Sequence, residues 1–171
     1  KPQLDFNHNK ELYAKSYGII LKDDDQIQKI KAACHLASSI LDKLCSAAIA
    51  GVTTQMLDDM SMQLHKEAKA VPAPLGYSTP PFPKSICTSI NEVICHGIPN
   101  DVPLKNGDIV NIDVTSILDG YYGDCSRMVA IGEISSDKQL VMDVSKECLS
   151  RAIAVCSPGV NISAIGEAIE E

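Results

Sequence analysis

Apolar residues recur with the spacing of an amphipathic helix in two long stretches of the chain. The first stretch opens on an acidic cluster at residues 23–25, which suits the positive end of a helix dipole. Gly51 ends this stretch, and Thr53 or Thr54 can cap a second helix. The two apolar stripes are Ile27, Ile30, Ala33, Cys34, Ala37, Ile40, Leu41 and Leu44, then Met56, Leu57, Met60 and Leu64. His65, near the end of the second helix, is interpreted as a solvated histidine.

The second stretch repeats this organisation later in the chain. Its helix is expected from about Asp137 to Cys156, with a further helix starting near Ser163. The predicted buried face is Leu140, Val141, Val144, Cys148, Ala152 and Val155. Three pairs of residues align at an offset of 108 (149 − 41): Leu41 with Leu149, Gly51 with Gly159, and Thr53 with Asn161. The repeat indicates two related halves rather than a solenoid.

Between the two repeats, two β-prone runs flank Asp119-Gly120, which favours the two-residue type I′ turn of a tight hairpin. With these residues as the loop, residues whose numbers sum to 239 face each other. Asp113 then pairs with Ser126, and Thr115 pairs with Asp124. Side chains alternate between the two faces along each strand. One face carries the polar residues Asn111, Asp113, Thr115, Asp124 and Ser126. The opposite face carries Val110, Ile112, Val114 and Cys125.

This hairpin makes Asp113 and Asp124 diagonal neighbours, with backbones on the order of 7–8 Å apart. Like charges that share a face repel each other, and a cation between them is the direct compensation. Oxygen ligands suit harder divalent ions such as Mn²⁺, Mg²⁺ or Fe²⁺. The alternative is a solvated polar face on an ordinary amphipathic hairpin, although aspartate is disfavoured inside strands.

Other segments carry weaker signals. The proline-rich residues 71–84 predict an irregular loop, whose Tyr77 and Phe82 either line a pocket or pin the loop to the core. Residues 85–94 return to a strand pattern, and His96 follows where this strand breaks into a Gly/Pro turn. Functional side chains are common at such positions, but a lone histidine is more often structural. Residues 13–21 are expected to dock as a short strand or arm.

Composition narrows the class of protein. The 171 residues suffice for one domain with a real core. A net charge of −7 argues against nucleic acid or an anionic membrane as the main partner. The seven cysteines lack close C-x-x-C spacing, so reduced thiols in a cytosolic protein are the simplest interpretation. Neither a secretory signal nor an apolar run of membrane-spanning length is found in the sequence.

Three ordered motifs resemble one family. They are P-K-S-I-C-T-S-I-N-E-V-I-C-H-G-I-P at 83–99, N-G-D-I-V-N-I-D-V-T at 106–115 and D-G-Y-Y-G-D-C-S-R at 119–127, and together they resemble the type I methionine aminopeptidases. The resemblance implies the α+β pita-bread fold, here its first half plus the start of the second pseudo-repeat. It also implies an N-terminal extension at 1–24 and the N-terminal portion of a single catalytic domain at 25–171.

The resemblance assigns roles to residues. Asp113 and Asp124 match the metal-binding aspartates, Asp124 being the ligand that bridges both ions. His96 matches the histidine that contacts substrate and steadies the tetrahedral intermediate. The methionine side-chain pocket would be lined by Tyr77, Phe82 and Cys87, and a nearby monovalent-cation site by Asn91, Val93 and Ser126. Two departures affect the pocket: the loop at 78–81 is longer than in bacterial forms, and phenylalanine stands at 82 where tyrosine is common.

The implied protein is a cytoplasmic metalloprotease, a hydrolase that removes the initiator methionine from new proteins, in proximity to the ribosome. Its cofactors would be two divalent ions of the Co, Mn, Fe, Zn or Ni class. Two alternatives remain open: another pita-bread peptidase, such as a prolidase or aminopeptidase P, and a non-catalytic binding homologue. The family's remaining histidine and two glutamate ligands lie in its second half, so this segment alone is expected to be inactive without that half.

Overall fold

The computed structural model describes residues 5–170; the first four residues and the last lie outside the described part. Five helices and four strands follow one another in mixed order. They are α1 (Phe6–Tyr17), α2 (Asp24–Ala47), α3 (Thr54–Glu67), β1 (Val71–Pro72), β2 (Cys87–Ile90), β3 (Ile109–Leu118), β4 (Tyr121–Ala130), α4 (Ser136–Val155) and α5 (Ser163–Glu170). This is the α+β arrangement that the sequence predicts, with strand β2 shorter than the predicted 85–94.

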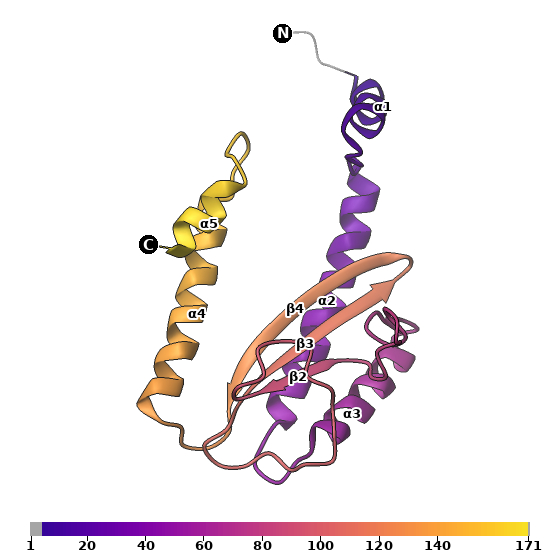
Figure 1. Cartoon of the computed structure of the whole chain (residues 1–171). Coiled ribbons are helices and arrows are strands. Elements are labelled where there is room, and N and C mark those ends of the chain that lie inside the picture. The colour runs from indigo at the N-terminus through magenta and orange to yellow at the C-terminus, as the bar shows by residue number, and fades with distance from the viewer. Residues whose placement is uncertain (1–4, 171) are drawn as a thin grey trace.

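The sheet is antiparallel and centred on β3. Strand β4 pairs with β3 along its whole length, from Ile109 opposite Ala130 to Leu118 opposite Tyr121. Strands β1 and β2 also pair with β3, so they share its other edge. Figure 1 shows the long β3–β4 hairpin in orange, with α2 crossing behind it. Strand β3 of the hairpin is therefore the strand with which every other strand of the described sheet pairs.

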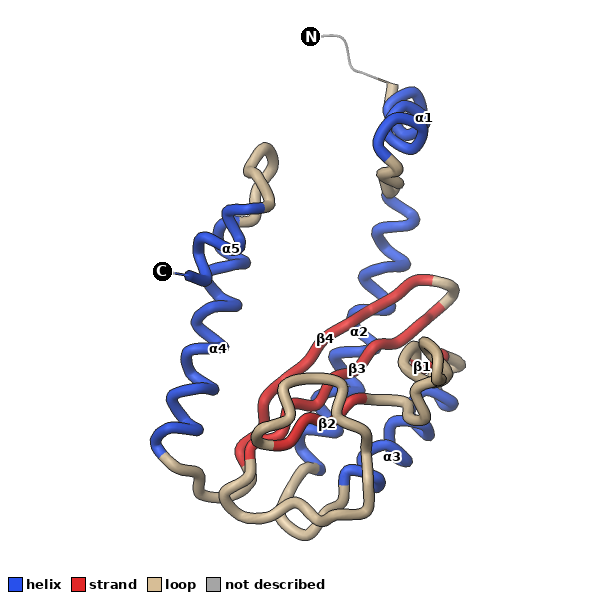
Figure 2. The backbone as a smooth tube through the Cα atoms, in the orientation of Figure 1, coloured by secondary structure: helices blue, strands red, loops and turns tan. Residues whose placement is uncertain are grey.

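Helices α2 and α3 cover one face of the sheet. The buried core combines residues from α2, α3 and the inward positions of β3: Ala37, Ile40, Leu41, Leu44, Leu57, Val110, Ile112 and Val114. This is the apolar face that the strand alternation predicts. Figure 2 shows the strands in red against these two helices. The opposite face of the hairpin carries its polar side chains, and no helix of residues 5–170 packs on it to a comparable extent.

The helix starts follow the predicted capping chemistry. The Asp23 carboxylate accepts a hydrogen bond from the Gln26 backbone N–H at 2.9 Å, and the Gln26 side chain accepts one from the Asp23 N–H at 3.0 Å. The Thr53 hydroxyl accepts one from the Met56 N–H at 3.1 Å. The acidic cluster at 23–25 thus serves the helix start, as the sequence indicates.

The internal repeat is confirmed in the element boundaries. Helices α2 and α4 end at Ala47 and Val155, which correspond at the offset of 108. Gly51 and Gly159 both take the left-handed backbone, with φ of 92° and 87°. The corresponding residues Thr53 and Asn161 each accept a hydrogen bond from a backbone N–H at the following helix start, Thr53 from Met56 at 3.1 Å and Asn161 from Ser163 at 3.0 Å.

Burial of α4 differs from the prediction. Among its predicted buried residues, Leu140 is 62% exposed, Val141 and Val144 are also exposed, and Ala152 is buried. Figure 1 shows α4 and α5 standing apart from the sheet, and within the described part α4 packs mainly on α5. The prediction of a buried face was wrong for this chain, because an apolar stripe becomes a core only where another surface covers it.

Two smaller predictions were also wrong. The segment 13–21, expected to dock as a strand or arm, forms no strand: its residues up to Tyr17 belong to helix α1, which begins where the Asp5 side chain accepts from the Asn7 N–H, and the helix ends at Gly18. His65 is only 1% exposed. Its Nδ1 lies 2.9 Å from the Ser61 carbonyl oxygen and its Nε2 lies 2.8 Å from the Ser116 hydroxyl, so it joins α3 to β3.

Candidate functional site

The turn of the hairpin sets the geometry of the site. Asp119 and Gly120 both have positive φ, 50° and 80°, as a type I′ turn requires. The observed partners are Asp113 with Ser126 and Thr115 with Asp124, as predicted. Side chains of the five polar positions, Asn111, Asp113, Thr115, Asp124 and Ser126, therefore share one side of the hairpin, which we call the carboxylate face.

Asp113 carries an uncompensated charge on this face. It is half-buried, and within residues 5–170 its carboxylate has no hydrogen-bond partner. Burial raises the pKa of the Asp113 carboxyl above its usual value, the negative charge of Asp124 raises it further, and His96 lowers it. Asp113, Asp124 and His96 therefore lie within electrostatic reach of one another. Such a group is stabilised by a bound cation.

Asp124 is held differently. It is exposed, and its Oδ1 accepts a hydrogen bond from the Thr115 hydroxyl at 2.9 Å. Its neighbour Gly123 lies against the backbone of α2, where a side-chain carbon would collide with the Ala33 carbonyl group. The absence of a side chain at Gly123 lets helix and hairpin approach closely, and this contact fixes the strand that presents Asp124.

His96 is positioned by the residue that follows it. Gly97 accepts a backbone hydrogen bond from Thr88 of β2 at 2.8 Å, and its own N–H donates to the Ser89 hydroxyl at 3.2 Å. A side-chain carbon on Gly97 would collide with the Thr88 carbonyl oxygen. His96 itself has φ of 55° and is exposed. The Cys-His-Gly segment is thus fastened beside β2, with the imidazole free.

Cys87 lies next to the carboxylates. It is the Cα partner of Asp113 across the β2–β3 pair, and partners in an antiparallel pair project from the same face. Burial, followed by the negative charges around it, raises the pKa of the Cys87 thiol to about 11. The side chain is therefore a neutral, poorly accessible thiol near neutral pH, which is compatible with the wall of an apolar pocket.

The other predicted pocket residues lie on the proline-rich loop. This loop closes on itself, because the Phe82 N–H donates to the Tyr77 carbonyl and the Gly76 N–H donates to the Phe82 carbonyl, both at 2.8 Å. Tyr77 is 74% exposed and Phe82 is half-buried. Contact of either ring with a methionine side chain stays a prediction.

The residues predicted for a monovalent cation do not converge. The Asn91 side chain is occupied by Asp108, by the Ile109 N–H and by the Lys138 ammonium, which lies 2.8 Å from its Oδ1. Ser126 is the cross-strand partner of Asp113, which is in turn the partner of Cys87. Cys87 and Asn91 are four residues apart, about 13 Å along an extended chain, so Ser126 lies well away from Asn91 along the strand direction. Val93 is exposed after a turn that its N–H closes onto Ile90. This site stays a prediction.

Two contacts were missed by reasoning from the sequence. Thr115 was placed on the carboxylate face, but its hydrogen bond to Asp124 was not anticipated; their predicted pairing was the signal that could have revealed it. Lys138, at the start of α4, also donates to the Gly107 carbonyl at 2.5 Å and so ties α4 to the turn before β3. No local pattern in the sequence indicates that contact.

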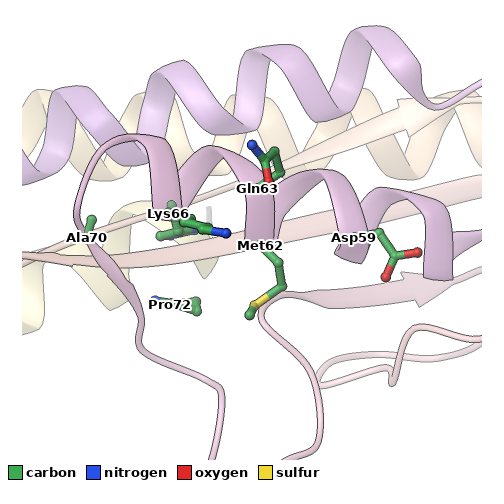
Figure 3. Close-up of a pocket in the computed structure, with 7 residues that line it drawn as sticks. Asp59, Met62, Gln63, Lys66, Ala70 and Pro72 are labelled. Atoms are coloured by element: carbon green, nitrogen blue, oxygen red, sulfur yellow. The ribbon is translucent and has the colours of Figure 1, made fainter.

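Pockets lie elsewhere in the described part. Figure 3 shows a shallow hollow along α3, lined by Asp59, Met62, Gln63, His65, Lys66, Ala70 and Pro72. It is open to solvent and is not lined by the carboxylate pair. Within residues 5–170, no three His, Cys, Asp or Glu side chains are grouped as a complete set of metal ligands. Asp113 and Asp124 are thus two oxygen donors on one face, without a third such side chain grouped with them in the described residues.

The chain is similar to a known protein family and to named proteins. The family described as Metallopeptidase family M24 matches residues 28–171. A methionine aminopeptidase of Chlamydia muridarum is 57% identical over 170 residues, which cover 99% of this chain and 58% of that protein. The chain thus spans well under two thirds of the length of this relative.

Solved structures show the same fold. The crystal structure of methionine aminopeptidase from Rickettsia prowazekii superposes with a TM-score of 0.85 at 46% identity, covering 88% of this chain and 60% of that one. An X-Pro aminopeptidase from Thermotoga maritima superposes with a TM-score of 0.71 at 20% identity, covering 95% and 43%, and shows the fold alone. The fold is the pita-bread fold of these peptidases.

Proposed function

The chain belongs to metallopeptidase family M24, and we propose that the intact protein is a methionine aminopeptidase, which hydrolyses the bond after an N-terminal methionine. The observation that carries this proposal is the placement of Asp113 and Asp124 on one face of the hairpin with His96 in electrostatic reach. The 57% sequence identity to a methionine aminopeptidase, over 99% of this chain, supports the proposal.

Membership of the family implies a divalent metal ion, and the carboxylate face fits one. The donors are two carboxylates, the oxygen ligands that hard divalent ions prefer. Asp113 is half-buried beside a like charge, and a cation would relieve both the desolvation and the repulsion. We infer that Asp113 and Asp124 would hold two ions of the Co, Mn, Fe, Zn or Ni class, with Asp124 as the ligand that both ions would share. Such ions, when bound, supply an activated water and polarise the carbonyl to be cleaved.

The remaining residues act on the substrate. The exposed His96 imidazole can donate a hydrogen bond to the oxygen on which charge develops as the peptide carbonyl is attacked. Cys87, with Tyr77 and Phe82, would contact the methionine side chain, since all three are apolar or neutral. The substrates are accordingly peptide and protein N-termini that begin with methionine. Cytoplasmic location, and proximity to the ribosome, follow from that substrate class as part of the proposal.

We further infer that residues 25–171 are the N-terminal portion of a single catalytic domain and that residues 1–24 are an extension. The family match begins at residue 28, shortly after α2 starts at Asp24. Helix α1 contributes no buried side chain, and its main tie to α2 is the Lys10–Asp23 ion pair at 3.1 Å. In the described part, no helix has the length and apolar character needed to cross a membrane.

The metal assignment is tested with two aspartate variants of the intact protein. Asp124→Ala should lose both ions, because a bridging ligand serves each of them. Asp119→Ala, at the turn, is the matched control and should keep the wild-type metal content. The measurement is elemental analysis after dialysis against metal-free buffer. Two tightly bound ions in Asp124→Ala would contradict the assignment.

The role of His96 is tested by kinetics. His96→Ala should lower kcat for a Met-Ala-Ser peptide by about 100-fold or more, the scale seen when one donor to a transition state is removed. Its metal content should stay at the wild-type level. Wild-type turnover by this variant would remove His96 from the mechanism. Cleavage of peptides with proline in second position, in preference to Met-Ala-Ser, would favour the aminopeptidase P alternative.

A further inference from the structure

Thr115 is the side chain that contacts the Asp124 carboxylate directly. Its hydroxyl lies 2.9 Å from Asp124 Oδ1, across the β3–β4 pair in which the two residues are Cα partners. An ionised carboxylate only accepts hydrogen bonds, so the hydroxyl must be the donor. Among residues 5–170 no other side chain donates to Asp124. Asp113, by contrast, has no such donor in the described part.

The strand that carries Thr115 is fixed from its other side. The next residue, Ser116, is fully buried and lies 2.8 Å from His65 Nε2 of α3. The Thr115 carbonyl accepts a hydrogen bond from the Ala73 N–H at 2.9 Å. Both contacts lie away from the carboxylate face, so they hold the backbone of β3 without occupying the Thr115 hydroxyl.

The strand that carries Asp124 is fixed in the same way. Gly123 is buried against the Ala33 carbonyl of α2, and Arg127 forms an ion pair with Asp42 of α2 at 2.6 Å. Thr115 and Asp124 are therefore two side chains on strands that separate helices hold in place. A hydrogen bond between groups fixed in this way restricts the rotation of the carboxylate with little further loss of backbone entropy.

The bond leaves the carboxylate able to bind cations. Each carboxylate oxygen has two lone-pair directions, so Oδ1 keeps one after accepting from Thr115, and Oδ2 keeps both. A carboxylate shared by two ions would use one free direction on each oxygen, so binding of both ions would depend on how the carboxylate is turned. The hydrogen bond from the Thr115 hydroxyl restricts that rotation. Partners of this kind, which orient a ligand without touching the metal, typically change metal affinity by about 10- to 100-fold.

We propose that Thr115 is a positioning residue that orients the Asp124 carboxylate for binding of two divalent ions. The proposal rests on the proposed function, because it takes Asp124 as the bridging ligand. An ordinary cross-strand contact would stabilise the hairpin without changing how the ions bind, and this difference makes the two interpretations separable.

The test is calorimetric titration of the metal-free intact protein with Mn²⁺. Thr115→Val keeps the branched shape and removes the donor, and should bind Mn²⁺ about 10- to 100-fold more weakly, with the greater loss for the second ion. Thr115→Ser keeps the hydroxyl and should restore wild-type affinity. Thr88→Val on β2 is the matched control, because the Thr88 hydroxyl is buried without a partner in the described part. Thr115→Ala provides a second variant without the hydroxyl.

Three results would overturn the proposal. Unchanged Mn²⁺ affinity and stoichiometry in Thr115→Val and Thr115→Ala would show that the hydroxyl does not position the ligand. Equal weakening in Thr115→Ser, which keeps the hydroxyl, and in Thr115→Val, which removes it, would show that the effect comes from local packing and not from the hydroxyl. Absence of Mn²⁺ binding by the wild-type protein would overturn the proposed function, and the role of Thr115 with it, which distinguishes that failure from the first two.

Discussion

Helices α2 and α4 end at corresponding positions of the internal repeat, and each is followed by a left-handed glycine and a second helix. Their surroundings differ. Leu41 of α2 is 2% exposed against the sheet, whereas the corresponding Leu149 of α4 is 60% exposed. The comparison separates two sources of structure: helix ends are set by nearby residues, while burial of an apolar face depends on a surface contributed by another part of the protein.

The largest effect is expected from matched truncations in the two helices. Leu41→Ala removes a fully packed side chain and should lower the free energy of unfolding by about 2–5 kcal/mol. Leu149→Ala should change it by about 0.5 kcal/mol or less, because the side chain is exposed. Urea unfolding of the 171-residue chain followed by circular dichroism measures both. Equal losses would show that α4 is as well covered as α2.

A smaller effect is expected at the contact between α3 and β3. Ser116→Ala leaves His65 Nε2 buried without a donor and should cost about 1–3 kcal/mol. Burial lowers the pKa of His65 below its ordinary value of 6.5. The unfolded chain therefore takes up the proton more readily, so this contribution to stability is present above pH 6.5 and is lost as the pH falls below it.

The pH dependence is measured by thermal unfolding between pH 5 and 8. His65→Gln should flatten the decline on the acid side, and His35→Gln, on the exposed surface of α2, is the control. If the melting temperature of His65→Gln falls with decreasing pH as steeply as that of the wild type, the buried imidazole is not the cause of the acid destabilisation. The hydrogen bond between His65 of α3 and Ser116 of β3 distinguishes α3 from α5, because α5 makes no comparable contact with the sheet in residues 5–170.

The smallest effect is expected at the helix starts, where the two repeats should behave alike. Thr53→Ala and Asn161→Ala each remove one side-chain acceptor for a helix N–H and should each cost about 1 kcal/mol of helix stability. Amide hydrogen exchange in the first turns of α3 and α5 measures this locally. A large change for Thr53 with none for Asn161 would contradict the view that capping is independent of the surroundings.

The sequence was most informative where neighbouring residues decide the structure. The Asp119-Gly120 turn determined the register of every pair in the hairpin, and so the shared face of Asp113 and Asp124. It was less informative for His65, although this residue lies on the same helical row as the buried Leu57 and Ser61, a spacing that could have revealed its burial.

The remaining errors have physical causes. Helix α1 buries no side chain, so it lacks the apolar periodicity on which prediction depends, and the β-branched Ile19 and Ile20 suggested a strand. The exposure of α4 could not be predicted from its own pattern, since the pattern is that of a buried helix. The hydrogen bond from Thr115 to Asp124 depends on side-chain rotamers, which pairing of the strands permits but does not determine.

The two-residue turn also limits how the length of this segment can change. Inserting one residue between Asp113 and Asp119 changes the parity of the alternation, and Asp113 and Asp124 would then project from opposite faces. Adding one residue to each strand beside the turn preserves the parity and keeps the two carboxylates together. Insertions and deletions that retain the site should therefore occur in even, symmetric steps, so the hairpin can lengthen or shorten only two residues at a time.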